Sequence, residues 1–164
     1  MIDPTPRTGP ANVPAWLADL LTQRATETAG APAPQQSAAV EITSFGYGHA
    51  APPTADIVVD ARRRFRNPHA DPRMRELTGL QEAVRAHVLA TPGVAAVISR
   101  TAQLAAELTT TAGTAGGPVT VAVGCVGGRH RSVAMAEAIA AELAGAGLPV
   151  ALVHRDVDRP VIQH

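Results

Sequence analysis

The sequence contains no lysine, a single cysteine and few aromatic residues. Aromatic side chains make up 2% of the 164 residues, which nearly excludes the base-stacking platforms of proteins that bind single-stranded nucleic acid. Cys125 alone cannot form an internal disulfide or a cysteine-rich zinc site. Charged residues are only 17% and the formal net charge is zero. The overall charge therefore gives no reason to expect a nucleic acid or an anionic membrane as partner.

Long hydrophobic runs are also missing. The most apolar stretch, residues 132–153, is interrupted by two glutamates and a proline, so it does not qualify as a membrane span. Residues 1–6 show neither the basic region nor the apolar region of a signal peptide. The histidines show no metal-ligand spacing. We expect a soluble, cytoplasmic protein with no membrane contact, no metal and no cofactor.

Composition divides the chain near residue 39. Residues 1–39 are rich in Pro, Thr, Ala and Gln, and this composition predicts an N-terminal extension that consists of a short helix over 14–28 and a linker. The helix either docks on the main domain or binds a partner. Residues 40–164 predict one α/β domain with a small parallel or mixed sheet flanked by helices. Its strands are predicted over 40–45, 56–60 (mostly buried), 119–123 and 149–153, and its helices over 79–90, 94–110 and 131–144.

The loop between the third strand and the last helix carries the chemistry. Gly127 and Gly128 allow backbone N–H groups to approach a ligand, and the helix that follows offers unpaired N–H donors at its first turn. Arg129 and Arg131 add guanidinium groups suited to phosphate oxygens, and His130 adds a further donor. These features predict an anion site at the carboxyl end of a strand. The alternative is a tight turn that needs glycine for steric reasons, with solvated arginines.

The same segment also has a cysteine-dependent phosphatase spacing, with Cys125 six residues before Arg131 and followed by Ser132. In such enzymes a thiolate attacks phosphorus, and a thiol at a helix N-terminus beside arginines suits that chemistry. The histidine that usually precedes the cysteine is replaced by Gly124. An inert cysteine buried at the strand end is the alternative.

Several motifs occur in one order along residues 40–155, and together they resemble the C-terminal domain of the RapZ family, the RNase adapter proteins. The motifs are Ser44-Phe45-Gly46-Tyr47, Ala55-Asp56-Ile57-Val58-Val59-Asp60, Arg66-Asn67-Pro68-His69, Asp71-Pro72-Arg73-Met74-Arg75, Leu77-Thr78-Gly79-Leu80 and Gly124-Cys125-Val126-Gly127-Gly128-Arg129-His130-Arg131-Ser132-Val133.

The resemblance implies a sensor domain that binds a phosphorylated amino sugar, glucosamine 6-phosphate, rather than an enzyme. It also implies contacts to a small regulatory RNA and an endonuclease in full-length relatives, and it leaves open a homo-oligomer or a protein partner. By matching motif, the ligand residues would be His69, Gly127, His130 and Arg131. The loop itself adds Gly128, Arg129 and Ser132 as candidate contacts.

Four departures from the family pattern bear on function. The family's N-terminal Walker-type loop has no counterpart in this sequence, which has no lysine. Val126 replaces the family's usual threonine, and one extra residue lies between Asp60 and Asn67. The end of the chain lacks the basic tail of some relatives. Binding of RNA is therefore expected to be weak, with one basic run available for it, formed by Arg62, Arg63 and Arg64.

Overall fold

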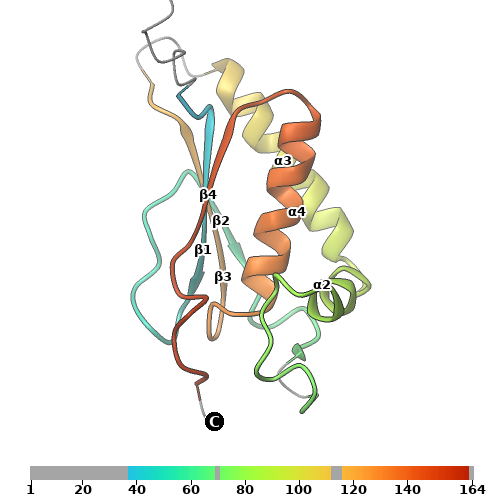
Figure 1. Ribbon diagram of the computed structural model, residues 1–164. Helices are drawn as coiled ribbons and strands as arrows, with labels where there is room; N and C mark the ends of the chain where they lie inside the picture. The colour runs from blue at the N-terminus through green and yellow to red at the C-terminus, as the bar shows by residue number, and fades with distance from the viewer. Residues whose placement is uncertain (1–36, 69–70, 112–115, 163–164) are drawn as a thin grey trace, which may run out of the picture. The chain divides into compact units, whose positions relative to one another are not determined.

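The computed structural model describes residues 37–68, 71–111 and 116–162. These residues form a four-stranded parallel sheet in the order β2–β3–β1–β4, packed against helices (Figure 1). The predicted α/β class with a small sheet is therefore confirmed. The strands are β1 (Val40–Gly46), β2 (Ile57–Asp60), β3 (Val119–Cys125) and β4 (Val150–His154), and the helices are α2 (Glu82–Leu89), α3 (Val94–Thr111) and α4 (Arg131–Gly145).

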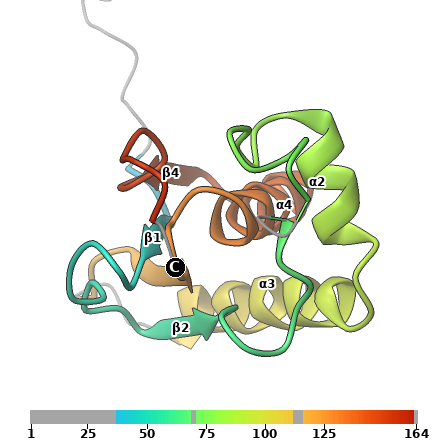
Figure 2. The ribbon, with the colours of Figure 1, turned by 90° about the horizontal axis from the view of Figure 1, so that it is seen from below.

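The connections decide where the helices lie. Parallel strands need crossover connections, and here β2 leads to β3 through α2 and α3, while β3 leads to β4 through α4. The β1–β2 connection, residues 47–56, contains no helix. As a result, α3 and α4 pack against each other on one face of the sheet (Figures 1 and 2).

The core lies between this face and the helices, and it is built from aliphatic side chains. Ile42 of β1 and Val121 of β3 point into it, as do Ile139 and Leu143 of α4, and all four are 1% exposed or less. Burying a side chain of this size stabilises the fold by about 1.5–3 kcal/mol. The scarcity of aromatic residues therefore does not prevent a packed core.

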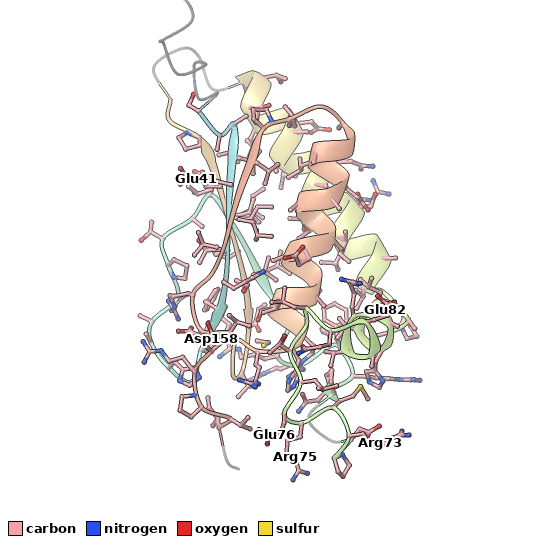
Figure 3. The ribbon with its side chains drawn as sticks, in the orientation of Figure 1. Glu41, Arg73, Arg75, Glu76, Glu82 and Asp158 are labelled. Carbon is pink, nitrogen blue, oxygen red and sulfur yellow. The ribbon has the colours of Figure 1, made fainter. Side chains whose placement is uncertain are left out.

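The opposite face of the sheet is partly open, which is unusual for parallel strands. Glu41 points away from the helices (Figure 3), and Val58 and Val153 are 50% and 59% exposed. The prediction that residues 56–60 form a mostly buried strand was wrong in this respect. β2 is an edge strand whose residues alternate between partly buried and exposed.

Helix α2 begins at Glu82, three residues later than predicted. Residues 78–81 instead form a turn, in which the Gln81 side chain accepts hydrogen bonds from the Thr78 N–H and hydroxyl. Gly79 donates its N–H to the Arg129 carbonyl oxygen at 2.8 Å. This turn is therefore packed on the loop that precedes α4.

The predicted extension, including its helix over 14–28, lies almost entirely outside the described residues, so the boundary near residue 39 stays a prediction. Within the described ranges, no helix has the length and apolar character needed to cross a membrane.

Candidate functional site

The carboxyl ends of β1, β2 and β3 meet at one edge of the sheet. Gly46 pairs with Cys125, and Asp60 pairs with Gly124. The three loops that follow these strands therefore converge, in the position where open α/β sheets bind ligands. Residues 126–130 form the loop from β3 to α4, as the sequence predicted.

The two glycines of this loop have different surroundings. Gly128 has a φ of +68°, and a Cβ there would lie 2.6 Å from the Gly46 nitrogen and 2.8 Å from the Asp156 Cβ. Both the left-handed conformation and the close approach to β1 require glycine at this position. Gly127 has no other group within 4 Å of the place its Cβ would occupy. One glycine is thus packed against the protein, and the other borders open space.

Arg131, the first residue of α4, is a buried cation, only 3% exposed. Its Nη1 donates to the carbonyl oxygens of Ala61, Arg62 and Phe65 at 3.0, 3.0 and 3.2 Å. Its Nε is buried and has no hydrogen-bond partner among the described residues. Burial lowers the pKa of this guanidinium from its ordinary value, since desolvation disfavours the charged form.

The strand-end carboxylate of Asp60 acts on Arg131 only through space, where it raises the pKa of the guanidinium against the effect of burial, because its hydrogen bonds go to Arg62. Asp60 accepts hydrogen bonds from Arg62 Nε at 2.9 and 3.0 Å and from its Nη2 at 2.6 Å. These hydrogen bonds hold the pKa of Asp60 below its ordinary value, against the opposing effect of burial. The Arg62 guanidinium also lies 3.6 Å from the centroid of the Tyr47 ring. Within the described part of the chain, Arg131 is left without a hydrogen-bonded carboxylate.

A pocket opens beside Arg131. It is lined by residues 125–127 and 129–131, together with Asn67, Val161 and Ile162. The cavity itself measures about 30 Å³, and the space between its walls is about 410 Å³ when the part open to solvent is counted. We call it the loop pocket. It brings Gly127, Arg129, His130 and Arg131 of the predicted site together.

Arg129 borders the loop pocket, but its donors are occupied by main-chain carbonyl oxygens. Its Nη2 and Nε donate to Glu76 and Leu77 at 2.7 and 3.2 Å, and its Nη1 donates to Val157 and Arg159 at 3.1 and 3.3 Å. Arg129 therefore fastens two segments to the loop. Figure 3 shows Glu76 and Asp158, which belong to these segments, at the same end of the molecule as the strand ends.

The other predicted side chains are buried in and around the loop. The His130 Nε2 lies 3.0 Å from the Met74 carbonyl oxygen, to which it donates because a carbonyl can only accept. Cys125 is 3% exposed, and its Sγ lies 3.2 Å from the Ser132 Oγ. Ser132 is fully buried and does not line the loop pocket. His69 lies outside the described residues, so its predicted contact stays a prediction.

The three arginines of the basic run predicted to bind RNA differ in their contacts. All three arginines are exposed, but the Arg62 guanidinium is hydrogen-bonded to Asp60 and lies over the Tyr47 ring. A metal site has no support in the described ranges, which contain no group of three or more His, Cys, Asp or Glu side chains placed to hold an ion.

The sequence analysis missed the contribution of the segment after β4. Asp156 is 1% exposed, and its Oδ2 accepts the Gly46 N–H at 2.8 Å and the Arg155 Nε and Nη2 at 2.9 and 2.8 Å. Burial opposes ionisation of Asp156, but these hydrogen bonds together hold its pKa below the ordinary value. The only hint in the sequence was the adjacent Arg155-Asp156 pair after the last predicted strand. It does not reveal that Asp156 accepts a hydrogen bond from Gly46 of β1.

The geometry defines an α/β domain with a pocket where parallel strands end and a helix begins, which is the position at which open α/β sheets bind ligands. Residues 38–158 match the RapZ C-terminal domain. The chain belongs to that family, as the motifs predicted.

Curated relatives carry the same segment within longer proteins. The chain is 45% identical over 119 residues to a nucleotide-binding protein of Streptomyces coelicolor, covering 72% of this chain and 40% of the relative. It is 47% identical over 123 residues to a nucleotide-binding protein of Thermus thermophilus, covering 73% of this chain and 43% of the relative. The chain thus spans about two fifths of the length of these relatives.

Proposed function

We propose that this chain is a binding or sensor domain for a phosphate-bearing small molecule, which docks in the loop pocket. The observation that carries the proposal is the state of Arg131. Three neutral carbonyl oxygens hold its Nη1, its Nε has no partner among the described residues, and it borders an open pocket. A buried charge is unfavourable unless a hydrogen-bonded counter-charge offsets it, and the through-space attraction of Asp60 does not cancel the effect of burial on Arg131. An anion in the pocket would supply a hydrogen-bonded counter-charge.

Two further features favour phosphate as the anion. The pocket lies at the N-terminus of α4, and the positive end of a helix dipole attracts negative charge. A guanidinium can also form paired hydrogen bonds to phosphate oxygens. Sugar phosphates, glucosamine 6-phosphate among them, are the first ligands to test because of the family expectation. The names of the relatives refer to nucleotides, and a nucleotide resembles the proposed ligand only in carrying phosphate.

The test is calorimetric titration with glucosamine 6-phosphate and glucose 6-phosphate. We expect Arg131→Ala to weaken binding by about tenfold or more, since it removes a charge-assisted contact of about 1.5–3 kcal/mol. Arg131→Lys should recover only part of the affinity, because an ammonium lacks the planar fork. Unchanged affinity in Arg131→Ala would contradict this placement.

Controls separate binding from folding. Arg131 also holds the main chain of residues 61–65, so its loss affects the fold as well. Gly127→Asp places a negative charge at the pocket wall, where a side chain has room, and should weaken binding without lowering the melting temperature. Arg100→Ala, at an exposed position of α3, should change neither property.

The phosphatase alternative makes a different prediction at Cys125. A sensor releases no phosphate, and its Cys125→Ser variant still binds the ligand. A malachite-green assay that detects phosphate release, lost in Cys125→Ser, would identify an enzyme instead. The weak RNA interaction expected for Arg62, Arg63 and Arg64 is measured separately, by a gel shift with structured RNA across a salt series.

A further inference from the structure

One wall of the loop pocket is apolar, and most of it comes from the end of the chain. Val161 and Ile162 line the pocket together with Val126 of the loop. Val161 and Ile162 belong to the segment after β4, residues 155–162, which we call the tail. Both lie beyond residues 38–158, the part of the chain that matches the family. The pocket therefore combines a cationic part within the family match with an apolar wall of which two of the three residues lie outside it.

The tail is held against the pocket by specific contacts. The buried Asp156 carboxylate accepts the Gly46 N–H, and Arg129 donates to the carbonyl oxygens of Val157 and Arg159. The Ile162 side chain lies over Gly48, where the Cβ of a larger residue would lie 2.3 Å from the Ile162 Cδ1 unless that methyl group moved. These contacts tie the tail to β1, to the residues after β1 and to the glycine loop.

The contacts leave Val161 and Ile162 partly buried rather than fully packed. Apolar side chains at a pocket wall gain free energy when a ligand removes them from water. A free phosphate ion offers no apolar surface to gain from such a wall. The organic group of a phosphate ester does, whether as the C–H face of a sugar ring or as an aliphatic or aromatic group.

We propose that Val161 and Ile162 are specificity-determining residues of the loop pocket. This inference rests on the proposed function, in which Arg131 holds the phosphate. The tail then contacts the organic group, so that the ligand class is a phosphate monoester whose organic group presents an apolar face. The phosphate site belongs to the family part of the chain, and the selectivity for the organic group belongs to its tail.

The experiment compares three probes on the full chain by calorimetry: inorganic phosphate, glucose 6-phosphate and phenyl phosphate. Ile162→Ser should weaken the binding of phenyl phosphate by about tenfold. It should weaken the binding of glucose 6-phosphate by less, because the sugar has less apolar surface in contact with the side chain. The affinity for inorganic phosphate should not change. Val161→Thr keeps the shape of valine and replaces a methyl with a hydroxyl, and should weaken phenyl phosphate by about threefold.

The outcomes distinguish this inference from the proposed function. If no probe binds the unmodified chain, the proposed phosphate site is wrong, and this inference fails with it. If the probes bind but both tail variants leave the affinity for the two esters unchanged, the tail does not contact the organic group of the ligand. An equal loss for phosphate and esters would show that the tail only holds the loop, which also overturns the inference. Val153→Ser, at an exposed valine of β4 that does not line the pocket, is the matched control.

Discussion

The loop between β3 and α4, taken with the first residue of α4, has two sides on which glycine and arginine have different surroundings. Gly128 and Arg129 are used by the protein itself, the first against β1 and the second against four carbonyl oxygens. Gly127 and Arg131 line the loop pocket, as Arg129 does, but Gly127 faces open space and the Arg131 Nε has no hydrogen-bond partner among the described residues. Residue type alone therefore does not assign a role within this loop.

The glycine pair gives the largest expected difference. Gly128→Ala should lower the free energy of unfolding by about 3 kcal/mol or more, because it combines a left-handed backbone with a clash against the main chain of β1. Gly127→Ala should change stability by less than about 1 kcal/mol, since its Cβ meets no atom. Urea unfolding of both variants measures the difference. Equal stabilities would erase the distinction between the two sides.

The arginine pair sharpens the comparison. Arg129→Ala removes donors from four carbonyl oxygens and should destabilise the protein by about 2–4 kcal/mol, with the tail affected first. Arg129→Lys should be almost as unstable as Arg129→Ala, because one ammonium group cannot reach acceptors on two segments. Hydrogen exchange should show faster exchange at residues 157–162 in Arg129→Ala. Unchanged exchange there would mean that Arg129 does not fasten the tail.

Acidification should have the smallest effect, through Asp156. Its pKa in the folded protein lies below its ordinary value, so the stability it contributes is complete above about pH 4, its unfolded range, and is lost as the pH falls through the folded value. The unmodified chain should therefore lose more unfolding free energy between about pH 5 and pH 3 than Asp156→Asn does. Asp158→Asn, at an exposed position two residues away, should behave as the unmodified chain. Parallel pH profiles for the unmodified chain and Asp156→Asn would contradict this role.

The sequence was most informative where local pattern and long-range structure agree. The apolar runs predicted β1, β3 and β4 to within two residues, and the glycine-rich segment predicted the loop between β3 and α4. The start of α2 was missed because residues 78–81 pack on the loop before α4, a contact that local helix propensity cannot reveal. The exposure of β2 was missed because only the strand order places it at an edge.

The candidate site was predicted in composition but not in the division of its roles. The sequence already favoured Arg131 over Arg129 by the family motif, but the acceptors that occupy the Arg129 donors lie on distant segments that the sequence does not reveal. The contributions of Asp156, Val161 and Ile162 depend on the path of the tail back to β1. No periodicity encodes that path, because it follows from hydrogen bonds between residues far apart in the chain.

The strand order also has a consequence for the time course of folding. Val40 of β1 pairs with Val119 and Val150, whereas no strand between β1 and β3 lies next to β1. During synthesis β1 therefore has no neighbouring strand among the described residues until β3 has been made. Contacts of such long sequence separation slow folding, since the closing of long loops precedes the gain from pairing. β1 is expected to acquire amide protection late, together with β3 and β4 and not as part of an early local unit.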